Sequence, residues 1–290
     1  MKITVTGATG HLGRLVVEHL LARGVAASDI TATGRDESKL APLAERGVRT
    51  VASDYDDAAS LDAAFAGTET LVLVSSSAVG QRLSQHTNAL RAAERAGVQH
   101  IVYTSAPHAD TSTLVLASEH KATEELLAAS SIETTVLRNN WYNENYEQAF
   151  GQAVSTGTYL ASTGTGKVAS AARSDYAEAA AVVASTGLHR GKTIELAGNT
   201  SWDGDEFAAV VSRVTGRDVR YEAVSTEQHR EILLGAGLDE QLVGFLVTLD
   251  GDIAQGLLDG PSDVLSSIIG HPTTNLEQTV TEWNEQNATA

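Results

Sequence analysis

Hydrophobic residues in the first half of the chain follow two alternating patterns. Short runs rich in Val, Ile and Thr are typical of buried strands. Six of these runs cover residues 2–7, 30–35, 49–54, 70–76, 100–105 and 133–138. Between the first two runs, Leu12, Leu15, Val16 and Leu20 recur at helical spacing ahead of Gly24, a typical helix stop. Helices are likewise expected near residues 57–66, 82–96 and 118–130.

This alternation predicts an α/β fold, in which helices cover a Rossmann-like, doubly wound parallel sheet. After about residue 140 the pattern loosens into a Gly-rich stretch at 157–168, a helix, a strand at 192–198 and more helices. We therefore predict a dinucleotide-binding domain at residues 1–140. A smaller C-terminal α/β lobe on the substrate side is expected mostly at residues 141–290, with some segments returning to the first domain. Ligands of such folds bind at the carboxyl edge of the sheet.

The first predicted strand runs into a glycine-rich loop, "TGATGHLG", at residues 6–13. Gly7, Gly10 and Gly13 lie three residues apart, directly after a strand and at the start of a helix, which is the context of a dinucleotide-binding loop. Glycines permit a tight turn and a close approach to a pyrophosphate, and the helix start presents free N–H groups. The loop therefore predicts a dinucleotide cofactor.

The end of the second strand indicates which dinucleotide is bound. Arg35 stands at the strand end and Lys39 follows one helical turn later, where an NADP site needs a basic residue for the 2′-phosphate. Asp36 is interpreted as the N-cap of the next helix rather than as a ribose ligand of an NAD site. These residues favour NADPH. Asp54, after the third strand, is either an acceptor for the adenine amine or a turn residue.

The composition narrows the classes of function. Twenty basic against 37 acidic side chains give a formal net charge of −17, which disfavours nucleic acid and anionic lipid surfaces as partners. There is no cysteine, so disulfides, thiolate metal sites and cysteine nucleophiles are excluded. Neither a signal peptide nor an apolar run of about 18 residues is found, so we expect a cytoplasmic protein with no membrane partner.

Two other kinds of site are dismissed from the motifs. The stretch at 162–168 resembles a phosphate-binding P-loop, but Ala161 and Val168 stand where that motif needs a glycine and a hydroxyl residue. No histidine pair has metal-ligand spacing, and no serine lies in a Gly-x-Ser-x-Gly elbow. Neither a metal centre nor a serine hydrolase is expected.

With this glycine spacing the chain resembles the short-chain dehydrogenases/reductases, which carry a Tyr-x-x-x-Lys pair on the helix after the fifth strand. Lys121 matches the lysine, but Ala117 stands at the tyrosine position. Carbonyl reduction forms an alkoxide and profits from a proton donor, whereas hydride addition to a quinone forms a phenolate-like anion with a pKa of about 10. The absent tyrosine therefore points to quinones. Lys121 is interpreted as a vestige, a ribose contact or a solvated surface residue.

Further segments carry a closer resemblance, to the type 2 NADPH:quinone oxidoreductases, which are NmrA-like, atypical short-chain reductases without the catalytic tyrosine. The segments that resemble this family's signature stretches lie at residues 6–13, 74–86, 103–112, 116–124, 137–146, 169–177, 192–202 and 270–274. They cover essentially the whole chain. Two departures are Asn140, where a glycine is expected, and Lys121, where an apolar residue is expected; the first bears on substrate fit.

The resemblance implies roles for individual residues. The cofactor-binding candidates are Gly7, Ala8, Thr9, Gly10, His11, Leu12 and Gly13 at the pyrophosphate, Arg35 at the 2′-phosphate, Ser76, Ser77 and Gln81 beside the ribose, His86, Thr104, Asn139, Trp141 and Tyr142. Tyr103, Thr104 and Ser105 end the fifth strand at the expected nicotinamide edge. No catalytic residue is assigned; the candidates are Asn140, Tyr103, His108 and Asn143, with His108, Asn143 and Asn145 as donors to the quinone oxygens. His86, Tyr103 and the Trp141–Tyr142 pair are equally explained as packing residues.

The expected function is direct hydride transfer from NADPH to a quinone, catalysed by proximity and orientation. The expected partner is a small-molecule quinone, and a homodimer is one open option for assembly. Two alternatives stay open. One is a non-enzymatic NADP(H)-binding redox sensor of the NmrA type, and the other is a reductase of triarylmethane-like conjugated electrophiles.

Overall fold

The computed structural model describes residues 1–289, which divide into two compact units. Unit 1 comprises Met1–Asp110, Leu116–Asn139 and Arg173–Leu196. Unit 2 comprises Thr111–Val115, Asn140–Ala172 and the described residues from Ala197 onward. The chain therefore leaves unit 1 and returns to it twice.

Unit 1 is built on one parallel sheet of seven strands. Its strands are β1 (Ile3–Val5), β2 (Ile30–Gly34), β3 (Arg49–Ala52), β4 (Thr70–Leu73), β5 (His100–Ser105), β6 (Glu133–Asn139) and β8 (Thr193–Leu196). Their order is β3-β2-β1-β4-β5-β6-β8, and every pair is parallel. The order reverses between β1 and β4, which is the switch point where doubly wound sheets bind ligands. The six predicted strands and the α/β class are confirmed.

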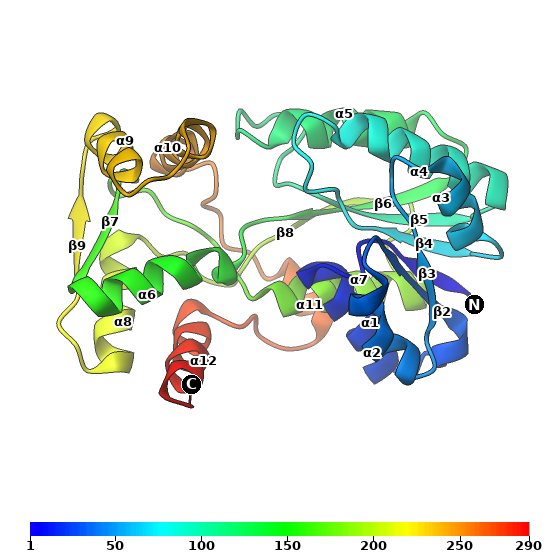
Figure 1. Cartoon of the computed structure of the whole chain (residues 1–290), viewed down its shortest axis with the longest axis horizontal. Coiled ribbons are helices and arrows are strands. Elements are labelled where there is room, and N and C mark those ends of the chain that lie inside the picture. Colours follow the sequence, from blue (N-terminus) through cyan, green and yellow to red (C-terminus); the bar gives the residue numbers. More distant parts are fainter. Residues whose placement is uncertain (290) are drawn as a thin grey trace. The chain divides into compact units, whose positions relative to one another are not determined.

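Helices cover both faces of this sheet (Figure 1). On one face lie α3 (Ala58–Phe65), α4 (Arg82–Ala96) and α5 (Ala117–Ala128). On the other lie α1 (His11–Ala22), α2 (Glu37–Glu45) and α7 (Arg173–Thr186), and a short turn, η1 (Ala27–Asp29), precedes β2. Phe65 and Tyr103 are among the largest fully buried side chains, in the core beneath α3, α4 and α5. All six strands predicted from the sequence are mostly or partly buried, as their apolar runs require.

The strand expected at 192–198 joins the main sheet as β8. Its residues pair in parallel register with β6, for example Val136 with Thr193 and Asn139 with Leu196. Helix α7, directly before it, packs against α1. An apolar run cannot say which sheet it joins, because strand pairing is a long-range choice.

Unit 2 is mostly helical. Its elements are η2 (Asn143–Tyr146), α6 (Glu147–Thr156), β7 (Thr158–Ala161), α8 (Gly204–Thr215), β9 (Arg220–Ala223), α9 (Thr226–Gly235), α10 (Glu240–Ala254), α11 (Val264–Ile269) and α12 (Leu276–Thr289). β7 and β9 form a two-stranded parallel sheet. In the interior of unit 2, the rings of Tyr146, Trp202 and Phe207 pack against one another, with centroids 4.6–5.8 Å apart. Within residues 1–289 no helix combines the length and apolar character that a membrane crossing requires.

Candidate dinucleotide site

The glycine loop joins β1 to α1 at the carboxyl edge of the sheet. Gly7 adopts a left-handed conformation, with φ of +62°, which only glycine takes without strain. The Gly10 N–H then donates to the Gly7 carbonyl at 2.9 Å, and the Ala8 N–H donates to Thr33 O at 2.9 Å. These bonds fold the loop back under the start of α1. The cap residue Gly10 has no side chain to accept from the first N–H groups of α1, so these groups stay available to an anion.

Gly13 lets α1 approach the loop closely. A Cβ atom at this position would lie 2.6 Å from the carbonyl carbon of Gly7 and 2.8 Å from the carbonyl oxygen of Thr6. Real Cβ atoms do not come this close to backbone atoms, so any side chain would push the helix off the loop. The third glycine of the motif is therefore a packing requirement.

Thr6 and Tyr55 tie the sheet together at the switch point. The Tyr55 hydroxyl lies 2.7 Å from both Thr6 Oγ1 and the Val74 carbonyl oxygen, and the Val74 N–H donates to Thr6 Oγ1 at 2.9 Å. The ends of β1, β3 and β4 are thereby fixed with respect to one another. Neither residue was predicted as part of the site, although both follow or end strands at the ligand-binding edge.

A cavity of about 380 Å³ opens at this switch point. It is lined by Thr6, Gly7, Thr9, Gly10, His11, Leu12, Gly13, Gly34, Arg35, Ser53, Asp54, Tyr55, Val74, Ser75, Ser76, Ser77, Ala78 and Gln85. The predicted loop residues, Arg35, Ser76 and Ser77 thus lie around one space. Ala8 is buried, and Gln81 is exposed outside the lining. Ser75 and Gln85 were missed, because nothing local distinguishes them from their neighbours.

Arg35 is exposed at the carboxyl end of β2, beside the cavity. The carboxylate of Asp36 is already engaged as the N-cap of α2, where Oδ1 accepts from the Ser38 and Lys39 N–H groups at 3.0 and 3.4 Å. The prediction that Asp36 is a cap is confirmed. A second cavity of about 430 Å³ adjoins the glycine loop, and Arg14, Lys39 and Arg46 line it. Glu18 also lines it, 3.8 Å from Arg14, so three cations face one carboxylate in this cavity, a balance that favours an anion.

Asp54 lines the first cavity and also forms a turn. Its Oδ1 accepts from the Asp56 N–H at 3.0 Å, which is the bond of an Asx turn. Its second carboxylate oxygen leaves the adenine interpretation open. Both alternatives drawn from the sequence are therefore compatible with its place.

His86 lies beneath the loop that follows β4 and is fully buried. Its Nε2 accepts from the Ser76 N–H at 3.0 Å, and its Nδ1 lies 2.9 Å from Thr123 Oγ1. Nε2 therefore carries a lone pair and Nδ1 carries the proton. Burial, reinforced by the charge of Arg82, lowers the pKa of His86 to about 3. This placement counts against a direct contact with the cofactor.

Tyr103, Thr104 and Ser105 end β5, as expected, but their side chains are buried and bonded within unit 1. The Tyr103 hydroxyl lies 2.8 Å from His120 Nδ1, and burial raises the tyrosine's pKa well above its usual value. Thr104 Oγ1 accepts from the Ser75 N–H at 3.0 Å. Ser105 Oγ donates to Glu124 at 2.6 Å. Their surroundings favour packing and positioning roles over contact with a substrate.

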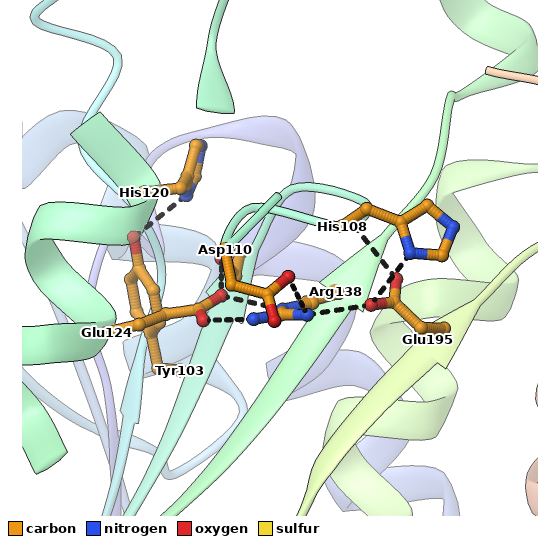
Figure 2. Close-up of polar contacts among 8 residues, drawn as sticks. Tyr103, His108, Asp110, His120, Glu124, Arg138 and Glu195 are labelled. Atoms are coloured by element: carbon orange, nitrogen blue, oxygen red, sulfur yellow. Dashed lines mark hydrogen bonds and ion pairs between the residues drawn. The ribbon is translucent and has the colours of Figure 1, made fainter. Parts of the chain in front are cut away.

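Arg138, on β6, is the centre of a charged cluster at the same edge of unit 1 (Figure 2). Its guanidinium donates to Glu124 Oε1 and Oε2 at 3.0 and 2.6 Å, to Asp110 at 2.8 Å and to Glu195 at 2.9 Å. These bonds raise the pKa of Arg138 above its ordinary value, so it is always charged. Glu195 in turn accepts from the His108 backbone N–H at 3.1 Å, and its Oε1 lies 3.3 Å from His108 Nδ1. His108 is exposed, with φ of +47°.

The remaining predicted residues follow β6 into unit 2. Asn143 is fully buried; its Oδ1 accepts from Ser170, and its Nδ2 donates to Thr274 O and Thr279 Oγ1. This is the environment of a structural amide, and it counts against a bond to a quinone oxygen. Asn140 is also buried and donates to Leu258 O at 3.2 Å. Trp141 and Tyr142 are half-buried, Asn145 is exposed, and Asn139, the last residue of β6 in unit 1, is buried.

Ala117 and Lys121 lie on α5, as the resemblance required. Ala117 is buried and supplies no acid, while Lys121 is exposed. The position that carries a tyrosine in the short-chain reductases is therefore an apolar packing position here. This arrangement excludes proton delivery by that pair.

We predict that the protein loses stability below pH 6.5 because of three buried histidines. Burial, reinforced by nearby Arg82 or Arg190, lowers the pKa of His86 and His120 to about 3 and of His100 to about 4. Between these pKa values and about 6.5, the unfolded chain binds protons that the folded chain does not. The neutral histidines therefore contribute their full share to the free energy of unfolding above pH 6.5, and that share falls as the pH falls. Each histidine contributes a slope of about 1.4 kcal/mol per pH unit. Urea unfolding at pH 7, 6 and 5 measures how the free energy of unfolding changes with pH. His120→Gln removes one of the three histidines, so this change should be smaller by the share of one proton. An unchanged slope in the variant would contradict the prediction.

Comparisons with known proteins agree with the α/β fold. The profile of the NmrA-like family matches residues 1–284. Quinone oxidoreductase 2 of Escherichia coli (strain K12) is 45% identical over 278 residues, which cover 96% of this chain and 97% of that protein. The crystal structure of the NADPH-dependent quinone oxidoreductase of Escherichia coli complexed with NADPH is similar with a TM-score of 0.93, covering 97% of this chain and 99% of that one, at 45% identity. The Citrobacter sp. triphenylmethane reductase complexed with NADP(H) is similar with a TM-score of 0.92 and 36% identity, covering 97% and 100%.

Proposed function

The chain belongs to the NmrA-like family, and on that premise we propose that it is an NADPH-dependent oxidoreductase that reduces quinones without a catalytic tyrosine. The observation that carries the proposal is a dinucleotide cradle combined with the buried Ala117 at the tyrosine position. Such a site holds a hydride donor but offers no dedicated acid. The similarity to a quinone oxidoreductase over nearly the whole of both chains supports the same substrate class.

The residues of unit 1 fit NADPH because the loop requires glycine at positions 7 and 13, and because Arg35 stands directly after β2 with Lys39 one helical turn later. The bound cofactor supplies the hydride. The N–H groups at the start of α1 bind the pyrophosphate, and Arg35 binds the 2′-phosphate. Ser76 and Ser77, across the switch point, orient the nicotinamide end. Asn139, Asn140, Trp141, Tyr142 and His108 stay predictions as contacts of the nicotinamide or the quinone.

Catalysis by this chain is then mainly positioning. A two-electron reduction of a quinone yields a hydroquinone anion that is about as basic as a tyrosine phenolate, so water can protonate it. The chain needs only to align the donor and a flat acceptor. The homodimer and the cytoplasmic location likewise stay predictions from the sequence.

The decisive assay follows NADPH oxidation at 340 nm with benzoquinone, naphthoquinone and a triarylmethane dye. NADPH oxidation that depends on added quinone supports the proposal. Preferential turnover of the dye favours the triarylmethane reductase, a candidate kept because of the structural similarity to that enzyme. Tight NADPH binding without turnover of any acceptor would replace the proposal with a redox sensor.

We predict that Arg35→Ala weakens the binding of NADPH by roughly 10- to 100-fold, which is the effect of losing one charge-assisted hydrogen bond to the 2′-phosphate. NADH lacks that phosphate, so its dissociation constant should hardly change. Titration of cofactor fluorescence with both dinucleotides measures the two constants. Arg23→Ala, which removes an exposed arginine beyond the end of α1, is the matched control. Equal losses for NADPH and NADH would contradict the assignment of the 2′-phosphate to Arg35.

A further inference from the structure

We propose that a buried clamp made of Arg82, Gln85, His86 and Glu119 positions Ser76 for the nicotinamide half of the cofactor. In this arrangement the side chains of α5 hold the loop that follows β4 in place, instead of supplying a catalytic acid. The proposal rests on the proposed binding of NADPH at the switch point. It assigns a positioning function to four residues, of which Gln85 lines the cavity and Arg82, His86 and Glu119 do not.

Every polar group of Ser76 is held by α4. The Ser76 N–H donates to His86 Nε2 at 3.0 Å, the Ser76 carbonyl oxygen accepts from Arg82 Nε at 2.8 Å, and Ser76 Oγ donates to Gln85 Oε1 at 2.5 Å. Ser76 Oγ also accepts from the Ala78 N–H at 3.1 Å. A surface loop seldom has the N–H and the carbonyl oxygen of one residue both bonded to buried side chains, since loops normally solvate their backbone. The bonds therefore fix one residue of the cavity lining.

Glu119, on α5, holds the far end of the same loop. Its Oε1 accepts from the Gly80 N–H at 2.7 Å, and its Oε2 accepts from Arg82 Nη1 at 3.2 Å. Thr123, one turn later on α5, fixes the His86 ring through Nδ1 and donates its own proton to the Glu119 carbonyl oxygen at 3.0 Å. Lys121, between them in sequence, is exposed and Ala117 is buried. The side chains of α5 that face the loop thus support it.

The clamp is built from groups that are costly to bury. His86 and Arg82 are almost completely buried, and the low pKa of His86 keeps it neutral, with Nε2 always available as the acceptor. A network with every member bonded is rigid, and the loss of one partner leaves a buried polar group unpaired. Such a network is expected where a fixed position matters for function.

The clamp should act on one half of the cofactor only. Arg35 directly follows β2 and Ser76 follows β4, so the two lie on opposite sides of the switch point between β1 and β4. The adenosine half of a dinucleotide lies over the β2 side, and the nicotinamide half lies over the β4 side. A ligand that carries only the adenosine half, such as adenosine 2′,5′-bisphosphate, should therefore be insensitive to the clamp.

The test compares two variants of His86 with the wild type, using calorimetric titration of NADPH and of adenosine 2′,5′-bisphosphate. His86→Leu removes the acceptor of the Ser76 N–H and should weaken NADPH binding about tenfold, the effect of one lost hydrogen bond that leaves an N–H unpaired. The dissociation constant of the bisphosphate should stay within about twofold of the wild-type value. His86→Gln can place an amide oxygen near the position of Nε2 and should restore most of the NADPH affinity. Equal losses for both ligands, or no loss for NADPH, would overturn the proposal.

Glu119→Ala decides the question if the His86 variants do not fold. It removes two bonds at the partly exposed end of the clamp, and it should again weaken NADPH selectively. Glu125→Ala, on the same helix and exposed, is the matched control and should change neither constant. The outcome is independent of turnover: if the wild type binds NADPH but reduces no quinone, the proposed function fails while the ratio of the two constants still tests the clamp.

Discussion

Gly13→Ala should abolish tight NADPH binding and destabilise the protein. The new methyl group would meet the backbone of Gly7 and Thr6 at 2.6–2.8 Å, so the start of α1 must move off the glycine loop. Overpacking of this kind costs about 1–3 kcal/mol of stability. With the glycine loop displaced, the affinity for NADPH should fall roughly 100-fold or more, equivalent to about 2.7 kcal/mol. Urea unfolding and cofactor titration measure the two effects.

Gly244→Ala is the matched control, because Gly244 also lies in a helix, α10, but has open space around its Cβ position. There the same substitution should stabilise the protein by about 0.5–1 kcal/mol, the difference in helix propensity. Opposite signs for the two substitutions would attribute the effect at Gly13 to the close approach. A Gly13→Ala variant with normal NADPH affinity would show that the loop is not the cofactor cradle.

Arg138→Met should be among the most destabilising single changes in unit 1. Arg138 is buried and binds Glu124, Asp110 and Glu195, and the Glu124 side chain is only 12% exposed. Removing the cation leaves a buried carboxylate without its partner, which costs about 3–5 kcal/mol. Urea unfolding at pH 7 measures the loss. Adding Glu124→Gln should recover part of it, because the unpaired charge is then gone.

Arg213→Met provides the comparison for Arg138. Arg213 also makes two bonds to one carboxylate, that of Glu277, at 2.9 and 2.8 Å, but these side chains are 57% and 48% exposed. Water can replace that pair, so the loss should be a small fraction of the loss at Arg138. Similar losses at the two sites would show that burial does not govern the Arg138 cluster. The 108–110 segment would also lose its anchor in Arg138→Met, since Glu195 bridges Arg138 and His108.

Local patterns predicted the elements of the fold well. The strand runs, the helix at 82–96 and the cap at Asp36 agree with the structure because each is decided by a few neighbouring residues. The glycine loop was recognisable for the same reason. Gly7 needs a positive φ and Gly13 needs the absence of a Cβ atom, and both constraints leave a mark in the sequence.

Roles of side chains in the site were predicted less well. Ser76 and Ser77 lie at the cavity, but His86 is buried beneath it and Tyr103 is bonded to His120. Leu83 and Ser84, on the same helix, are exposed, so the role of a residue on α4 depends on the helix phase and on the partners from α5. Tyr55 and Gln85 were missed because their contacts come from strands and helices distant in sequence.

The sequence by itself determined the order of strands and helices, the dinucleotide loop, the basic end of β2 and the alanine at the tyrosine position. These follow from residue identity and short spacing, which local sterics and capping translate directly into structure. Only the tertiary structure decided that β8 joins the main sheet, that Asn143 is an internal amide and that α5 supports the Ser76 loop. Each of these depends on contacts between residues far apart in the chain, which form only when the packing of the whole unit brings them together.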